Sequence, residues 1–144
     1  MSVKQILEEK GHDVFTLNDG ATLGDAAQAL ATRRIGALIL LDAEGKLAGI
    51  LSERDVVRMI GTKGPDCLTQ SVADVMTRTV TTCGENATVN EAMELMTNGR
   101  FRHIPVVERG KLIGVISIGD LVKRRIEDAE REAEDMRTYI AAAG

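Results

Sequence analysis

Aromatic residues are nearly absent from this sequence: they make up 2% of its 144 residues, and tryptophan does not occur. Proteins that bind single-stranded nucleic acid stack the bases on aromatic side chains and carry a basic surface. The formal net charge here is -4. The scarcity of aromatic side chains and the negative net charge both argue against a general nucleic-acid binder. Hydrophobic residues still amount to 44%, so the core must be built from aliphatic side chains and methionine.

Cysteine and histidine are also scarce, with two residues of each type. Cys67 and Cys83 match no metal-binding spacing and no disulfide framework, and we assign no role to His12. The N-terminal residues lack the long apolar core of a signal peptide, and no apolar run approaches the length of a membrane span. We therefore expect a cytoplasmic protein.

Motifs of catalysis are missing as well. The sequence contains no nucleophile elbow, no phosphate-loop GxxxxGK, no HExxH and no dinucleotide-binding glycine fingerprint. We expect a protein that is not an enzyme, with no metal and no catalytic cofactor. One arrangement stays open, a carboxylate pair formed by Asp55 and Asp120, which occupy matching positions in the sequence.

The strongest feature that is present is an internal repeat. GKLAGILSERDVVRMI (45–60) aligns without a gap with GKLIGVISIGDLVKRR (110–125), and ATLGDAAQALATRRIGALILLD (21–42) aligns with ATVNEAMELMTNGRFRHIPVVE (87–108). Further upstream, VKQIL (3–7) matches VADVM (72–76). A repeat this short would bury little apolar surface alone, so we expect the two repeats to pack together.

Each repeat is predicted to have the order β-α-β-β-α. A short strand (14–17 or 80–83) precedes a helix that begins with the capping-box pattern after Thr22 or Thr88, and a hairpin then leads into a helix that begins at Ser52 or Ser117. The expected fold class is therefore α/β (α+β). The expected segments are repeat 1 at 1–62, a linker at 63–71, repeat 2 at 72–126 and a C-terminal helical extension at 127–144.

The last helix is predicted to run far beyond the second repeat. Apolar residues recur at alternating spacings of four and three, as in a coiled coil. Two interpretations stay open: a solvated helix that packs on its own domain, or a seam that pairs with a second copy. We favour a homodimer in which the domain supplies most of the contact, since alanines weaken the seam. Its residues are Val122, Ile126, Ala129, Ala133, Met136 and Ile140.

The repeat resembles the cystathionine-β-synthase (CBS) domain, and the pair resembles a Bateman module. The resemblance is carried by GILSERD (49–55), GVISIGD (114–120), RHIPVV (102–107) and its counterpart GALILL (36–41). It implies two repeats packed by pseudo-two-fold symmetry, two clefts between them, and assembly of modules into a flat disc. It also implies that the module binds AMP, ADP, ATP, S-adenosylmethionine or a dinucleotide and regulates an attached or separate partner.

By this resemblance, the better nucleotide site belongs to the second repeat. Asp120 would accept from the ribose hydroxyls, Ser117 would contact phosphate, and Arg102 and His103 would lie beside the phosphates. The chemistry fits, because an ionised carboxylate only accepts, a helix N-terminus attracts anions and guanidinium is a fork of donors. The simpler alternative is that Ser117 and Asp120 only cap a helix. The adenine would be lined by Val80, Thr82, Ile104 and Pro105.

The first repeat carries the same pattern with one difference. Gly36 and Ala37 stand where the second repeat has Arg102 and His103, so we expect this site to hold phosphate less well. A glycine before each helix start, Gly49 or Gly114, is expected to let the backbone approach the ligand closely. The other candidate binding residues of this repeat are Thr16, Leu38, Ser52, Arg54 and Asp55.

The sequence thus favours a non-catalytic regulatory module that senses cellular energy or redox state by binding an adenine nucleotide and signals to an unidentified partner protein. AMP is the first candidate ligand, and ATP, NADH and S-adenosylmethionine are the alternatives. A ligand-independent structural dimerisation or adaptor module is the competing hypothesis, motivated by the apolar seam of the last helix.

Overall fold

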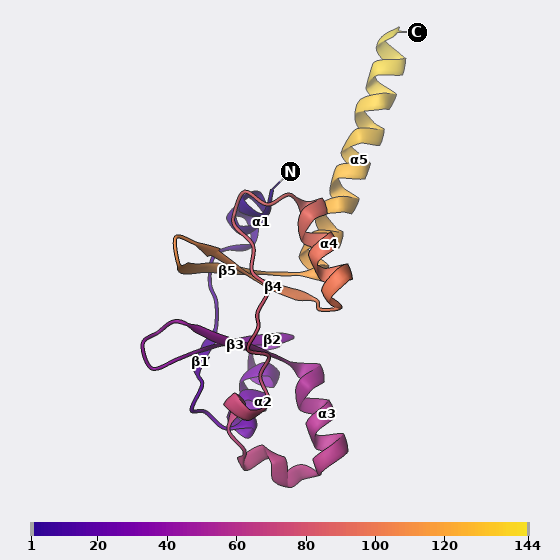
Figure 1. Cartoon of the computed structure of the whole chain (residues 1–144). Helices are drawn as coiled ribbons and strands as arrows, with labels where there is room; N and C mark the ends of the chain where they lie inside the picture. Colours follow the sequence, from indigo (N-terminus) through magenta and orange to yellow (C-terminus); the bar gives the residue numbers. More distant parts are fainter. Residues whose placement is uncertain (1, 144) are drawn as a thin grey trace. The chain divides into compact units, whose positions relative to one another are not determined.

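The computed structural model of this chain describes residues 2–143 and divides into two compact units (Figure 1). The first-repeat unit comprises Asp13–Thr81. The second-repeat unit comprises the segment up to His12 together with the segment from Thr82 onward. Each unit combines helices with one small sheet, which confirms the predicted α/β class.

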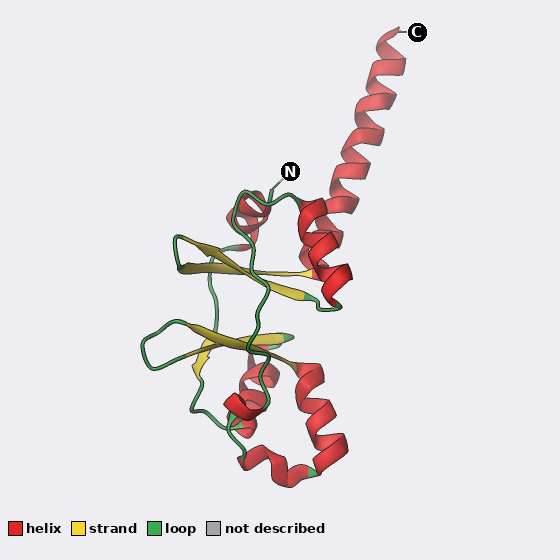
Figure 2. Ribbon diagram, in the orientation of Figure 1, coloured by secondary structure: helices red, strands yellow, loops and turns green. Residues whose placement is uncertain are grey.

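The first-repeat unit is a three-stranded sheet with helices on one side of it (Figure 2). Strand β2 pairs with β1 in parallel and with β3 in antiparallel orientation. Its elements are β1 (Thr16–Asn18), α2 (Leu23–Arg33), β2 (Ala37–Leu41), β3 (Leu47–Ser52), α3 (Glu53–Lys63) and the 3-10 helices η1 (Pro65–Thr69) and η2 (Val72–Asp74). The expected linker at 63–71 thus contains a helical turn, and its Cys67 is buried in the core of the unit.

The second-repeat unit is built on the antiparallel hairpin β4–β5. Its elements are α1 (Val3–Lys10), α4 (Val89–Gly99), β4 (His103–Glu108), β5 (Lys111–Ser117) and α5 (Ile118–Ala143). The strand predicted at 80–83 is wrong in extent, because only Cys83 pairs, with Val106. The next bond of a parallel ladder would need the backbone N–H of Pro105, which proline lacks.

The predicted helix starts are confirmed by reciprocal capping bonds. At α2, α3 and α4 the N-cap side chains of Thr22, Ser52 and Thr88 accept a backbone N–H from the third helical residue. The acidic side chain of that residue accepts the N-cap backbone N–H in return. Each box satisfies two donors that would otherwise lack partners at the start of the helix.

The predicted long C-terminal helix is confirmed, since α5 is continuous over 26 residues. Leu121 and Arg124 are buried against their own unit, but every described residue after Asp128 is exposed. In Figure 1 this part of α5 projects beyond α1 and α4. The first turns of α5 therefore pack on their own unit, and the rest of the helix is solvated in the single chain. Among residues 2–143, no helix combines the length and hydrophobicity needed to cross a membrane.

The two repeats exchange their first segments. Helix α1 precedes the first repeat, yet Val3, Ile6 and Leu7 lie in the core of the second-repeat unit. Conversely, Val72 and Met76 precede the second repeat but lie in the core of the first-repeat unit. Each core is therefore completed by a segment that the sequence attaches to the other repeat.

Two glycines mark where the exchanged segments pack. A Cβ atom on Gly114 would lie 2.5 Å from Leu7 Cδ2, and one on Gly49 would lie 2.6 Å from Met76 Sδ. Leu7 and Met76 hold matching positions in the repeat, so the same contact occurs twice. The expectation that these glycines admit a ligand is corrected: what approaches their backbone is the exchanged segment.

Gly114→Ala is expected to reduce the free energy of unfolding by about 1–3 kcal/mol, because the added methyl group overpacks the core against Leu7. In a Leu7→Ala background the same substitution should cost far less, since the truncated side chain leaves room. Urea denaturation of the two single variants and the double variant measures this coupling.

Gly119→Ala is the matched control, because a Cβ there meets only Ser117 Oγ at 3.6 Å and alanine favours the helix by up to about 1 kcal/mol. Strictly additive effects of Leu7→Ala and Gly114→Ala would contradict the contact.

Candidate functional site

The start of hairpin β4–β5 and the start of α5 bring together the four residues expected to bind phosphate and ribose. His103 is the cross-strand partner of Ser117, and the backbone N–H of Ile118 donates to the carbonyl of Arg102 at 2.8 Å. Asp120 lies in the first turn of α5. The strand pairing therefore places Arg102, His103, Ser117 and Asp120 at one end of the second-repeat unit.

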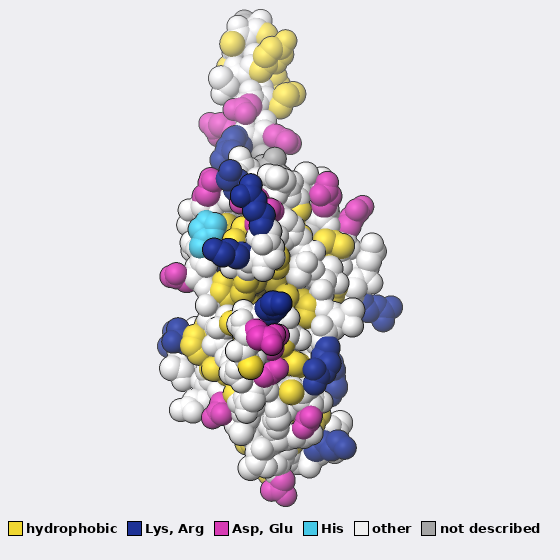
Figure 3. All heavy atoms as spheres, turned by 60° about the vertical axis from the view of Figure 1, so that its left-hand side comes forward, with side chains coloured by type: hydrophobic (Ala, Val, Ile, Leu, Met, Phe, Trp, Pro, Cys, Tyr) yellow, Lys and Arg dark blue, Asp and Glu magenta, His cyan; other side chains and the backbone are white. Residues whose placement is uncertain are grey.

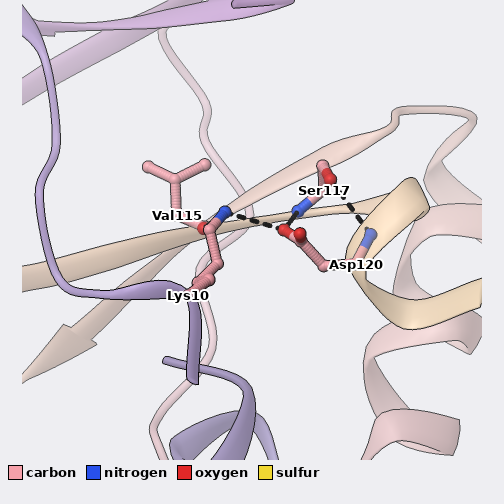
Figure 4. A network of polar contacts seen from close by, with 4 residues as sticks. All are labelled: Lys10, Val115, Ser117 and Asp120. Atoms are coloured by element: carbon pink, nitrogen blue, oxygen red, sulfur yellow. Dashed lines mark hydrogen bonds and ion pairs between the residues drawn. The ribbon is translucent and has the colours of Figure 1, made fainter. Parts of the chain in front are cut away.

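Ser117 and Asp120 cap α5 reciprocally. The Ser117 backbone N–H donates to Asp120 Oδ2 at 2.8 Å, and the Asp120 backbone N–H donates to Ser117 Oγ at 3.2 Å (Figure 4). The simpler structural role weighed from the sequence is thus realised. The same bonds also fix the carboxylate beside the positive end of the helix dipole, where an anionic ligand is favoured.

Lys10, at the end of the exchanged helix α1, is a site residue that the sequence reasoning missed. Its Nζ donates to Asp120 Oδ2 and to the Val115 carbonyl, at 2.8 and 3.0 Å (Figure 4). The lysine and the carboxylate are 110 positions apart in the sequence. Only the exchange of α1 brings them together, and a pattern confined to one repeat does not reveal it.

The contact with Lys10 changes the acidity of Asp120. Burial by itself would raise the pKa of this carboxyl, but the hydrogen bonds from Lys10 and Ser117 and the charge of Lys10 outweigh it, so the pKa lies below the ordinary value of 3.8. Asp120 is therefore ionised at neutral pH and acts purely as an acceptor, as a pair of ribose hydroxyls requires.

Arg102 is exposed, and its guanidinium forms no hydrogen bond or ion pair with another of residues 2–143. His103 is half-buried at the start of β4. Of the residues expected to line the adenine, Ile104 and Pro105 are buried on β4 and Thr82 is exposed, all in the second-repeat unit; Val80 is half-buried in the first-repeat unit.

The first-repeat unit repeats this geometry without the cation. Ala37 is the cross-strand partner of Ser52, and the Glu53 N–H donates to the carbonyl of Gly36 at 2.9 Å. Ser52 and Asp55 cap α3 as Ser117 and Asp120 cap α5. Two further candidates lie on β strands: Thr16 pairs with Ile39, and Leu38 is buried. Arg54 is exposed on α3.

Asp55 has a different cationic neighbour from Asp120. Its Oδ1 lies 3.6 Å from a guanidinium nitrogen of Arg58 on the same helix. Arg58 is largely exposed, with a side-chain exposure of 71%, so this pair is well screened by water. The two aspartates differ in environment although the repeats place them equivalently.

A small depression lies beside the Lys10–Asp120 pair in the second-repeat unit. Its volume is about 90 Å³, well below the roughly 300 Å³ at which small-molecule sites begin. It is a charged recess between α1 and α5 and cannot itself hold a nucleotide. Its lining residues are Ile6, Glu9, Lys10, Asp120, Lys123, Arg124 and Glu127.

Metal and thiol chemistry find little support in the described part of the chain. No group of three or more His, Cys, Asp or Glu side chains among residues 2–143 is arranged to hold a metal ion. Burial, with a contribution from Glu108, raises the pKa of the Cys83 thiol to about 11. Cys83 is therefore protonated at neutral pH, and the thiolate needed for a redox role is absent.

Comparison with known proteins identifies the repeats. The family model of the CBS domain matches residues 3–62 and 72–127. The mitochondrial CBS domain-containing protein CBSX3 of Arabidopsis thaliana is 35% identical over 83% of this chain and 60% of its own length. This chain also matches 22–23% of the length of three further Arabidopsis CBS domain-containing proteins. The chain thus spans between about a fifth and three fifths of these relatives.

Solved structures give the same result. A CBS-domain containing protein from Agrobacterium tumefaciens has a TM-score of 0.84 and 47% identity, over 86% of this chain and 92% of that one. A CBS domain protein from Pyrobaculum aerophilum, complexed with AMP, has a TM-score of 0.75 and 26% identity over 83% and 89%. A CBS domain pair in complex with 5′-methylthioadenosine and S-adenosylmethionine shares the fold, with a TM-score of 0.79 and 23% identity over 89% and 98%.

The pKa of Asp120 gives a test of its contact with Lys10. A carboxyl with a lowered pKa stabilises the fold fully above its unfolded pKa, near 3.8, and this stabilisation is lost as the pH falls through the folded pKa. Lys10→Met should therefore lower the free energy of unfolding at neutral pH, and much less once the pH lies below the folded pKa of Asp120.

Denaturant titrations across this pH range measure the difference between the wild type and the variant. Lys4→Met, which removes an exposed lysine from the same helix, is the control. A deficit for Lys10→Met that persists undiminished at low pH would show that the ion pair is not its cause.

Proposed function

Because this chain belongs to the CBS-domain family and carries two copies of the domain, we propose that it is a regulatory module that binds an adenine nucleotide without transforming it. The observation that carries the proposal is the cluster of Arg102, Ser117 and Asp120 at one end of the second-repeat unit. An exposed cation, a helix N-terminus and an ionised carboxylate there offer complementary contacts to a phosphate and a ribose.

In the proposed binding mode, the ribose hydroxyls donate to Asp120, and the phosphate lies between the N-terminus of α5 and Arg102. The adenine packs on the aliphatic residues Ile104 and Pro105 and bonds to backbone near Thr82. AMP is the preferred candidate ligand, supported by the AMP complex of the relative from P. aerophilum. ATP, NADH and S-adenosylmethionine are the alternatives.

Lys10 has a defined part in this proposal. Its ammonium group donates to Oδ2 of Asp120, so a ribose that bonds to this carboxylate shares Asp120 with Lys10 or displaces it. Binding then alters a bond between α1 and α5, and we propose that this change is what a partner protein senses.

The site of the first repeat is proposed to be the weaker of the two. Ser52 and Asp55 offer the same cap and carboxylate, but Gly36 and Ala37 supply no cation to a phosphate. Thr16, Leu38 and Arg54 complete the proposed contacts of this site. A neutral ligand group would fit it better than a phosphate.

The remaining features of the proposal concern the cellular setting. We propose a cytoplasmic homodimer that reports energy or redox state to a separate protein. Within such a scheme, Asp55 and Asp120 are binding groups and not a catalytic pair.

Arg102→Gln is expected to weaken AMP binding about tenfold, as expected for the loss of a charge-assisted hydrogen bond, and to leave adenosine binding unchanged. Adenosine has the ribose and the base but no phosphate, so the comparison isolates the guanidinium. Isothermal titration calorimetry with each ligand measures both affinities.

Arg100→Gln is the matched control, since Arg100 is also exposed and lies two positions earlier. An equal loss for AMP and adenosine would place Arg102 elsewhere than at the phosphate. If the wild type gives neither heat nor a melting shift with millimolar AMP, ATP, NADH or S-adenosylmethionine, the nucleotide proposal is wrong.

A ligand-independent adaptor is the second candidate function, favoured by the exposed apolar residues of α5. Deleting the chain after Asp128 separates the two, because Leu121 and Arg124 still complete the core. A nucleotide sensor truncated there should keep its affinity for AMP. An adaptor should bind no nucleotide even at full length, and truncation should cost it only its assembly in size-exclusion chromatography.

A further inference from the structure

We propose that α5 pairs with α5 of a second copy of this chain as a parallel, in-register two-stranded coiled coil. The inference concerns an interaction surface distinct from the nucleotide site and does not depend on nucleotide binding. It specifies the occupant, the orientation and the charged residues that select both.

The apolar seam of α5 is uncovered in the single chain. The exposed fractions of Val122, Ile126, Met136 and Ile140 are 43%, 54%, 59% and 64%, and the seam residues between them, Ala129 and Ala133, are exposed as well. Figure 3 shows hydrophobic side chains gathered on the projecting part of the helix. Apolar residues that recur every four and three positions over the length of a helix are expected to be covered by another helix.

The second-repeat unit covers the side of α5 that lies opposite the apolar seam. If the seam residues are assigned to heptad positions a and d, with Ile126 at a, then Arg124 falls at f and Leu121 at c. Both are buried. Since f lies across the helix from the a/d seam, packing on the domain and pairing with another helix use different faces and are compatible.

The charges beside the seam favour a parallel partner. In a parallel pair, the g residue of one helix faces the e residue about five positions further along the other. This rule places Arg125 opposite Glu130 of the second copy, and Glu132 opposite Arg137. Both contacts join opposite charges, and symmetry makes each of them twice.

The antiparallel alternative is disfavoured by the same residues. In the register that matches the six apolar positions, e faces e and g faces g. Glu130 then faces Glu130 and Glu132 faces Glu132 of the other copy, while Lys123 faces Arg137. Each contact joins like charges. The sequence beside the seam therefore selects a second copy in parallel register.

Existing contacts of these side chains do not oppose the pairing. Arg125 donates one N–H to Asn90 of α4 at 2.7 Å, but a guanidinium has five donors and can bond to a second acceptor. Arg137 lies 4.0 Å from Glu134 of its own helix, and both are more than 70% exposed. A contact this long and solvated is easily replaced.

Charge reversal in the full-length chain tests the pairing. Glu132→Arg sets like charges opposite Arg137, and Arg137→Glu sets like charges opposite Glu132, so each single variant should raise the dimer dissociation constant about tenfold. The double variant Glu132→Arg/Arg137→Glu should restore it. Sedimentation equilibrium measures the constant, and these exposed positions lie beyond the part of α5 that packs on the core.

The orientation has its own readout. Ala143→Cys extends the seam by one d position at the C-terminus, and two such helices in parallel bring their thiols together. In a glutathione redox buffer this variant should form a disulfide-linked dimer, whereas Ala142→Cys, at a position off the seam, and the wild type should not.

Three outcomes would overturn the proposal. They are a wild type that stays monomeric at hundreds of micromolar, a dimer whose constant ignores both charge reversals, and equal disulfide formation by Ala142→Cys and Ala143→Cys. Calorimetry of Glu132→Arg with AMP keeps this proposal separate from the nucleotide proposal, because its affinity for AMP should equal that of the wild type.

Discussion

The contact between an exchanged apolar side chain and a glycine is the constraint on which both units depend. Leu7 against Gly114 and Met76 against Gly49 complete cores that neither repeat completes from its own sequence. Close-packed interiors tolerate little change in volume, so a leucine or methionine and its facing glycine form a matched pair. The duplication preserves this pair in both copies, although the flanking residues have diverged.

The exchange also shapes the candidate site. Helix α1 ends at Lys10, and the packing of Leu7 against β5 is what holds Lys10 beside Asp120. A carboxylate that caps one helix therefore also bonds the end of another, which comes from the far end of the chain. The core of the unit and the chemistry of the site consequently share one short helix. A substitution that disturbs the core is therefore expected to affect the site, and the reverse.

The sequence predicted the helices, the hairpins and the duplication because these depend on local patterns. Capping residues such as Thr22 and Ser52 specify where a helix begins, whatever the rest of the chain does. The exchange of first segments was not predictable in this way, because Val3 and Val72 fit either core equally well by hydrophobicity. The shortened strand near Cys83 depended on Pro105, a residue of the neighbouring strand, whose missing N–H affects only the pairing.

The candidate site was likewise predictable where it depends on local sequence and not where it depends on tertiary contacts. The alignment of Arg102 with Gly36 and of Ser117 with Ser52 already distinguished the two repeats, since it needed no tertiary structure. The alignment of the repeats could not reveal Lys10, because the role of this residue arises from a contact across 110 positions. The lowered pKa of Asp120 follows from that contact and could not be anticipated from the Ser-x-x-Asp pattern alone.

Helix α5 joins the cap at Asp120 to the far end of the chain without a break, and this gives it the mechanics of a lever. Its first turns are clamped by Leu121 and Arg124, and the part of the helix from Arg124 to Ala143 rises by about 1.5 Å per residue, which gives an arm of about 28 Å. A tilt of about 5° at the clamped end would move the tip of such an arm by about 2.5 Å. Movements too small to disturb the packing around the carboxylate are thus magnified at the tip to the size of a side-chain contact.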